Sequence, residues 1–342
     1  MLYAVLLKTH ANVRYLQSIE KLALAELQCI LQAWGMDAKP GIQEISEVSF
    51  LVFEVDAISD SAWTAISRHA SIAFAASVEG ELLRPLPLTR DDYLSGDIAE
   101  VLKYKGKTNA DFTSTAFHCA LSASDFARDA QPLTVLDPVC GKGTTLFCAV
   151  QEGHHAVGVD VDSKAITEAD AYFARYLKYH KLKHRRTAGS LTLPKGNDVK
   201  NSAKEIRYFF ANTPERYRAG DILTLRFVLG DTRAVDQMLG SKSCHIIVGD
   251  LPYGVQHAPR QGGKPVSIGK LLEEAMPAYE RVLKPGGTIA LSFNTYTLPK
   301  QAVAEAMRRV GFNVLEQAPY ADFSHWVEQA VDRDLVIAKK EG

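Results

Sequence analysis

The segment VLDPVCGKGTTLF (135–147) carries the residues best suited to holding a ligand. An apolar run ends at Asp137, and a loop with Gly141 and Gly143 leads into a helical pattern. These glycines permit a tight turn and a close approach of backbone to ligand, but the segment lacks the third glycine of a dinucleotide loop and the G-K-[ST] of a P-loop. Because the Asp137 carboxylate would repel a pyrophosphate and attract a cation, the segment favours a positively charged ligand. The alternative is a tight turn with no ligand.

Two further carboxylates follow apolar runs. Asp160 ends HAVGVD, 160 − 143 = 17 residues after Gly143, where an acid can accept hydrogen bonds from ribose hydroxyls. Asp162 or Ser163 is the expected cap of the next helix. The third run ends in Gly230-Asp231-Thr232, whose carboxylate suits the amino group of a purine.

The sequence IIVGDLPYG (246–254) indicates the reaction type. The Asp250 carboxylate and the backbone carbonyls after it can accept the protons of an exocyclic amine, while the Tyr253 ring stacks on its base. Carbonyl and carboxylate acceptors favour the pyramidal form of a delocalised amine nitrogen and align it with a sulfonium methyl group. The pattern therefore predicts methylation of nitrogen, and its alternative is a proline turn after a buried strand.

The chain resembles the class I S-adenosylmethionine-dependent methyltransferases. The resemblance rests on DPVCGKG (137–143), GVDVD (158–162), LGD (229–231), GDLPYG (249–254) and LKPGG (283–287), and covers about residues 109–342. The D-L-P-Y form looks like the amino-methyltransferase variant. Its combination with D-P-x-C-G-x-G-T is most similar to the tRNA guanosine-N2 methyltransferases associated with THUMP domains.

The resemblance implies S-adenosyl-L-methionine as cofactor and assigns roles by position. The catalytic tetrapeptide is Asp250, Leu251, Pro252 and Tyr253, with leucine where many relatives have proline. The implied cofactor-binding residues are Asp137, Pro138, Cys140, Gly141, Gly143, Thr144, Asp160, Val161, Asp231 and Thr232. No metal and no covalent intermediate are expected.

These observations predict a cytoplasmic enzyme that methylates an exocyclic base amine in structured RNA, most simply guanosine N2 of tRNA. One alternative is a DNA amino-methyltransferase acting on adenine N6 or cytosine N4. Another is an inactive cofactor-binding RNA scaffold, whose tetrapeptide would be broken, whereas this one is intact.

Two domains are expected to position these residues. Residues 1–85 predict a small α+β, ferredoxin-like domain. Residues 86–108, which begin within RPLPL (84–88), are expected to form a linker, and residues 109–342 the methyltransferase domain. In the latter, apolar runs at 133–138, 155–160, 225–231, 245–250 and 287–294 alternate with helical patterns. That alternation predicts a Rossmann-like parallel sheet with helices on both faces, whose ligands bind at the carboxyl ends of the strands.

An insertion at about 173–222 begins with the basic segment YLKYHKLKHRR (176–186). From Phe173 to Tyr208 there are 10 Lys and Arg and 2 Asp and Glu, a net charge of +8. Residues 1–85 carry 6 Lys and Arg and 10 Asp and Glu, a net charge of −4. The expected RNA phosphate contacts are Lys181, Lys183, Arg185 and Arg186. The alternative is a solvated helix surface. His180 and His184, four apart on that helix, have no acidic or thiol partner nearby for a metal site.

Composition limits the remaining possibilities. The 342 residues carry 39 Lys and Arg against 40 Asp and Glu, so any polyanion site must be a local patch. Five widely spaced cysteines disfavour a disulfide framework. The apolar start, MLYAVLL, is short for a membrane span and is expected to form a first strand.

Overall fold

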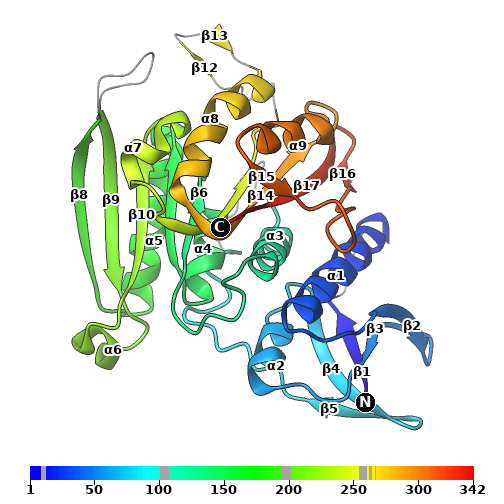
Figure 1. The fold of residues 1–342 in the computed structure, drawn as a ribbon. Helices are drawn as coiled ribbons and strands as arrows, with labels where there is room; N and C mark the ends of the chain where they lie inside the picture. The colour runs from blue at the N-terminus through cyan, green and yellow to red at the C-terminus, as the bar shows by residue number, and fades with distance from the viewer. Residues whose placement is uncertain (9–12, 101–107, 194–201, 254–259, 262–263, 266) are drawn as a thin grey trace.

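A computed structural model of the chain describes residues 1–8, 13–100, 108–193, 202–253, 260–261, 264–265 and 267–342. Two sheets dominate it, a five-stranded sheet near the amino terminus and a ten-stranded sheet in the rest of the chain (Figure 1). Among the described residues, which include all five cysteines, no disulfide forms. No helix in the described part of the chain is long and apolar enough to cross a membrane.

The first sheet belongs to a ferredoxin-like α+β unit, as predicted. Its strands follow the order β2-β3-β1-β4-β5 and every pair is antiparallel. The elements are β1 (Leu2–Leu7), α1 (Val13–Ala33), β2 (Gly41–Ile45), β3 (Val48–Glu54), α2 (Asp60–Ser67), β4 (Ile72–Glu79) and β5 (Leu82–Leu86).

Two details of this unit are not evident from the sequence. Residues 41–54 form the hairpin β2–β3, turned by Ser46 and Glu47, whose φ angles of 49° and 63° suit a primed two-residue turn. Pro85, expected at the start of the linker, lies in β5 opposite Ala76. Because β5 is an edge strand, the missing N–H of Pro85 is tolerated there.

The larger part of the chain alternates strands and helices. Its elements are α3 (Ala110–Ala123), β6 (Thr134–Asp137), α4 (Thr144–Gln151), β7 (His155–Asp160), α5 (Ser163–Tyr179), β8 (His184–Thr192), β9 (Ser202–Phe210), α6 (Pro214–Ala219), β10 (Leu223–Leu229), the 3₁₀ helix η1 (Thr232–Ala234), α7 (Val235–Leu239), β11 (Cys244–Asp250), β12 (Arg260–Gln261), β13 (Lys264–Pro265), α8 (Ile268–Val282), β14 (Leu283–Asn294), α9 (Lys300–Arg309), β15 (Phe312–Val314), β16 (His325–Glu328) and β17 (Val331–Lys340).

The large sheet has the order β15-β17-β14-β11-β6-β7-β10-β9-β8, with β16 paired to β17. Strands β10, β7, β6, β11 and β14 are parallel, as predicted. The sheet as a whole is mixed, because β8, β9, β15, β16 and β17 pair antiparallel. The chain runs outward from β6 through β7 to β10 and later starts again beside β6 at β11. In Rossmann-like folds, ligands bind beyond the carboxyl ends of the strands at such a reversal.

Helices cover both faces of the large sheet (Figure 1). Alternate side chains of each strand enter two separate cores: in β7, Ala156 packs with one core, whereas Val157 and Val159 pack with the other. The first core also receives α3, α4 and α5, and the second receives α7, α8 and α9. In α5, Asp162 supplies the expected cap by accepting from the N–H groups of Lys164 and Ala165 at 2.8 and 3.3 Å.

The basic insertion contains a β-hairpin, not the helix surface named as the alternative. Helix α5 ends at Tyr179, and His184 already belongs to β8, so His180 and His184 do not share a helix. Strands β8 and β9 extend the sheet beyond β10 and form its outer edge (Figure 1).

A buried charged network joins the two parts of the chain. Glu26 on α1 accepts hydrogen bonds from His118 Nδ1 at 2.6 Å, Thr115 Oγ1 at 2.7 Å and the Ala70 N–H at 2.9 Å. The other nitrogen, His118 Nε2, lies 2.7 Å from Glu152 Oε1 at the end of α4. Because both ring nitrogens face carboxylates, His118 is held as an imidazolium ion.

Candidate functional site

The glycine loop is a tight turn pressed against β7. Gly141 and Gly143 have φ angles of +50° and +89°, which favour glycine, and Gly143 caps α4. The Cys140 N–H donates to Val159 O at 3.0 Å. A Cβ on Gly158 would lie 2.6 Å from Cys140 Sγ, so the close approach of loop and strand requires glycine there as well. The loop is therefore a rigid turn at the carboxyl edge of the sheet.

Asp160 fixes this loop and remains at its surface. Its Oδ2 accepts from the Gly141 N–H at 2.7 Å and its Oδ1 from the Asp162 N–H at 2.8 Å. Burial raises the pKa of Asp160, although those backbone N–H groups oppose the rise. The next side chain, Val161, is 68% exposed, so an apolar surface stands open beside the carboxylate.

Asp137 lies beneath the loop, buried, with its Oδ1 accepting from the Val139 N–H at 3.0 Å. Burial, opposed by hydrogen bonds from Thr145 and Val139, raises its pKa to about 7, and the nearby carboxylates of Asp160 and Asp250 contribute to the rise. Three acidic side chains, from the ends of β6, β7 and β11, thus lie close together at one edge of the sheet.

The predicted purine-binding acid, Asp231, is ion-paired to an arginine that sequence reasoning missed. Arg233 donates to both carboxylate oxygens, with Nη2 to Oδ2 at 2.6 Å, and its Nη1 reaches Glu274 at 2.8 Å. Neighbouring Thr232 is buried, with its hydroxyl 2.7 Å from Tyr279 OH. Asp231 therefore lies at the strand end as expected, but its oxygens are occupied.

The tetrapeptide begins at the carboxyl end of β11, where three hydroxyl groups converge on Asp250. Its Oδ1 accepts from Tyr253 OH at 2.6 Å and from Ser292 Oγ, and its Oδ2 accepts from Thr108 Oγ1. Leu251 is buried, and its N–H donates to Ser292 O at 2.8 Å, which ties the tetrapeptide to β14. These donors hold the carboxylate in one orientation.

Arg333 completes this cluster from β17. Its Nε donates to Tyr253 OH at 2.6 Å, and its Nη2 lies 4.0 Å from Asp250 Oδ2. The guanidinium carbon stands 4.8 Å from the centre of the Phe112 ring and 5.3 Å from that of Tyr253. Burial and the Asp250 charge raise the pKa of Tyr253, so its hydroxyl stays protonated and donates. Arg333 is thus a positioning residue for both ends of the tetrapeptide.

Several predicted residues have structural contacts instead of open surfaces. Pro138 packs on Gly249, where an added Cβ would lie 3.3 Å from Pro138 Cδ. Cys140 and Thr144 are buried, and burial raises the pKa of the Cys140 thiol well above its ordinary value. Cys140 therefore stays protonated and is unsuited to nucleophilic catalysis.

The expected RNA contacts do not all have the same surroundings. Lys181 and Lys183 are exposed just before β8, and Arg185 is exposed near the start of that strand. Arg186 instead pairs bidentately with Asp170 on α5, at 3.0 and 2.8 Å. The basic sequence HAPRQGGKP (257–265) predicts a loop that closes over substrate, but it lies largely outside the described residues, which include the short pair β12–β13 there. Within the part of the chain that the structure describes, no three metal-ligating side chains cluster.

Comparison with known proteins gives distant structural similarities. No protein-family model and no curated protein matches the chain. The solved structure of TrmN from Thermus thermophilus aligns with a TM-score of 0.41 and 16% identity over 91% of this chain and 64% of its own. The rRNA methyltransferase aviRa from Streptomyces viridochromogenes aligns with a TM-score of 0.39 and 14% identity over 72% of this chain and 90% of its own. A TehB-like SAM-dependent methyltransferase from Corynebacterium glutamicum aligns with a TM-score of 0.35 and 17% identity over 63% of this chain and 84% of its own. At these values they assign neither a family nor a substrate to this chain.

Proposed function

We propose that residues 109–342 form an S-adenosylmethionine-dependent methyltransferase domain that acts on an exocyclic base amine in structured RNA, most specifically guanosine N2 of tRNA, in the cytoplasm. The observation that carries this proposal is the convergence of Asp137, Asp160 and Asp250 beside a rigid glycine turn. Such a concentration of negative charge favours a cationic ligand, and a sulfonium cofactor is cationic.

Each part of the loop has a matching role towards this cofactor. The glycine turn at 141–143 would hold the methionine end, and Asp160 would accept from the ribose hydroxyls, since each of its oxygens has one backbone donor and a remaining lone pair. Exposed Val161 offers an apolar surface for the adenine ring. Asp231 would need to exchange a hydrogen bond with Arg233 to accept from the adenine amine.

The tetrapeptide suits an amine that must be oriented before it attacks. Asp250 accepts two hydroxyl groups at Oδ1 and one at Oδ2, so Oδ2 keeps a lone pair for a substrate amine, and the Tyr253 ring beside it can stack on the base. Arg333 would stabilise the Asp250 charge while the amine binds. When bound, the cofactor supplies the electrophilic methyl group, and the proton of the methylated amine passes to water.

Asp160→Asn is expected to weaken S-adenosylmethionine binding on the order of 30-fold, because charge-assisted hydrogen bonds to the ribose contribute about 2 kcal/mol or more. Asp162→Asn is the matched control, since it removes the same charge two residues away and asparagine still caps α5. Isothermal titration calorimetry measures both affinities. Equal affinity for the wild type and Asp160→Asn would remove Asp160 from the cofactor site.

The exposed basic residues at the start of β8 provide the test for RNA. Combined reversal of Lys181, Lys183 and Arg185 to glutamate is expected to weaken tRNA binding at least about tenfold and to flatten its salt dependence, because phosphate contacts release counterions. Cofactor affinity should stay unchanged. Arg186→Glu is measured separately, because this substitution also breaks the ion pair between Arg186 and Asp170. Unchanged RNA affinity and salt slope in the triple variant would leave this segment as a solvated surface.

A further inference from the structure

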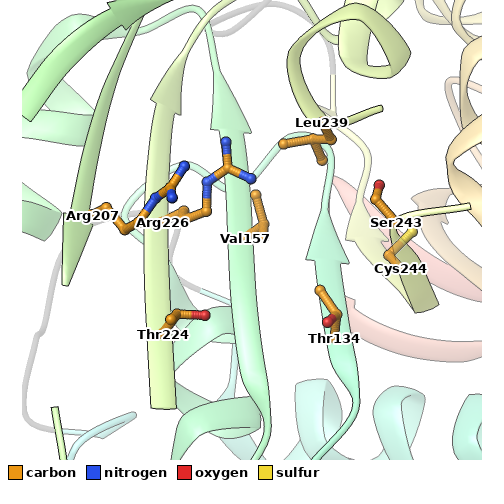
Figure 2. Close-up of a pocket in the computed structure, with 8 residues that line it drawn as sticks. All are labelled: Thr134, Val157, Arg207, Thr224, Arg226, Leu239, Ser243 and Cys244. Atoms are coloured by element: carbon orange, nitrogen blue, oxygen red, sulfur yellow. The ribbon is translucent and has the colours of Figure 1, made fainter. Parts of the chain in front are cut away.

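A cavity lies on the face of the large sheet that packs with α7, α8 and α9. It has a volume of about 250 Å³, and its lining includes Thr134, Val157, Arg207, Thr224, Arg226 and Leu239. Figure 2 shows the two arginine side chains beside each other on neighbouring strands, with Leu239 on the other side of Arg226 from Arg207. Thr134 is the first residue of β6 and Thr224 the second of β10, so the cavity lies towards the amino ends of the strands. Asp137, Asp160 and Asp250 lie at the opposite ends of their strands.

The cavity exists because this part of the sheet has little helical cover. Helix α7, which follows β10, has only five residues. The side chains that β9 and β10 direct to this face therefore stay partly exposed, with 34% for Arg207 and 17% for Arg226. A ligand from solvent can reach both guanidinium groups.

The charges in the cavity are unbalanced. Arg207 and Arg226 are direct cross-strand partners, an arrangement of like charges that destabilises a sheet. Glu205 is the carboxylate they share: its Oε2 accepts from Arg226 at 2.7 Å and from Arg207 at 3.1 Å. Two arginines and one glutamate leave a net charge of 2 − 1 = +1. The group is therefore suited to an additional anion.

One donor in the cavity is buried without a hydrogen-bond acceptor among the described residues, namely Arg207 Nε. Buried donors in native proteins nearly always have a partner, so an orphan at this position indicates a missing acceptor. The planar array of guanidinium donors matches the oxygens of a phosphate group. A volume of about 250 Å³ is below the ~300–1000 Å³ typical of drug-sized ligands, which fits a single phosphate group better than a whole nucleotide.

The surroundings favour a nucleic acid as the source of that phosphate. Strand β9 also carries Phe209, with the Arg185 guanidinium 4.3 Å and that of Arg207 6.0 Å from its ring centre. An aromatic ring between arginines is typical of surfaces that bind single-stranded or looped RNA. We infer that the Arg207–Arg226 cavity binds a backbone phosphate of the RNA substrate, away from the reaction centre. This inference rests on the proposed RNA methyltransferase function.

The test uses the full chain, a fluorescein-labelled 12-nucleotide oligouridylate, unfractionated tRNA and inorganic phosphate. Arg207→Gln and Arg226→Gln are each expected to weaken the binding of both RNAs about tenfold. Each should also reduce the slope of log affinity against log salt concentration by about 0.7 to 1. Glu205→Gln should have the opposite effect and strengthen RNA binding on the order of threefold, because it removes the carboxylate that competes with phosphate for the arginines. Arg308→Gln is the matched control, because it removes an arginine paired with Glu316 elsewhere on the surface.

A structural role for the Arg–Glu–Arg group predicts a different pattern. All three variants would then unfold more easily, with RNA affinity and salt slope unchanged, and that result overturns the inference. Changed affinity for inorganic phosphate with unchanged affinity for both RNAs would also overturn it, since the site would then serve a free anion. If the wild type transfers methyl groups to RNA while the arginine variants bind RNA normally, only this inference fails. If the variants lose RNA affinity but the wild type transfers no methyl group, only the proposed function fails.

Discussion

Replacement of Asp250 by alanine is expected to reduce methyl transfer at least about 100-fold, the loss that follows removal of one preorganised polar group from a reaction centre. Thr108, Ser292 and Tyr253 all donate to this carboxylate, so its orientation is fixed before substrate arrives. Single-turnover transfer of the labelled methyl group, at saturating cofactor and RNA, measures the step directly. Cofactor affinity should remain, because Asp160 and the glycine turn are untouched.

Matched variants separate chemistry from folding. Asp125→Ala removes a surface carboxylate paired with Lys339 and should leave the rate unchanged. Tyr253→Phe keeps the ring and should retain most activity, whereas Tyr253→Ala loses base stacking of about 1 to 3 kcal/mol and should raise the RNA concentration needed for half-maximal rate. Full activity in Asp250→Ala would exclude the tetrapeptide from the chemistry.

His118→Gln is expected to destabilise the protein by about 3 to 5 kcal/mol, because it leaves the buried Glu26 and Glu152 carboxylates without their cation. Burial alone would lower the pKa of His118, but Glu152 and Glu26 raise it to about 10. A raised histidine pKa contributes stability that is fully present below the unfolded value of about 6.5. That contribution is lost as the pH rises towards about 10.

Urea denaturation followed by circular dichroism at pH 6, 8 and 10 checks this prediction. The wild type should lose stability steadily across that range, and His118→Gln should lose the part of the slope that His118 contributes. His184→Gln, which removes an exposed histidine, should behave as the wild type. A His118→Gln variant with the wild-type unfolding midpoint and slope would show that the network does not stabilise the protein.

The parallel strands were predictable because they are largely apolar runs, and four of the five end in an acid or directly before glycine or proline. Strand β7 was predicted residue for residue, and β11 within one residue. The antiparallel additions were harder. In β8 nearly every residue is exposed, so HRRTAGSLT has no apolar alternation, and its basic start suggested a helix surface. The turn at Ser46-Glu47 has none of the usual Asn-Gly or Asp-Gly signals.

The candidate site was predictable where a motif lies at a strand end, and not where distant segments meet. Asp137, Asp160 and Asp250 converge as the motif order requires, since parallel strands end at one edge. Ser292 could have been found by the same rule, because it lies near the end of the predicted run 287–294. Arg333 could not, since its position depends on β17 pairing antiparallel with β14. The pairing of Asp231 with Arg233 likewise depends on side-chain geometry at a local turn.

The most direct test is transfer of the tritiated methyl group from S-adenosylmethionine to total RNA of a strain that lacks this protein, followed by nucleoside identification. The account predicts labelled RNA in which the product is an amino-methylated base, N2-methylguanosine in the tRNA fraction. Label in DNA alone would instead favour a DNA amino-methyltransferase. A product methylated on carbon, oxygen or a ring nitrogen, or no transfer to any nucleic acid despite cofactor binding, would contradict the central claim.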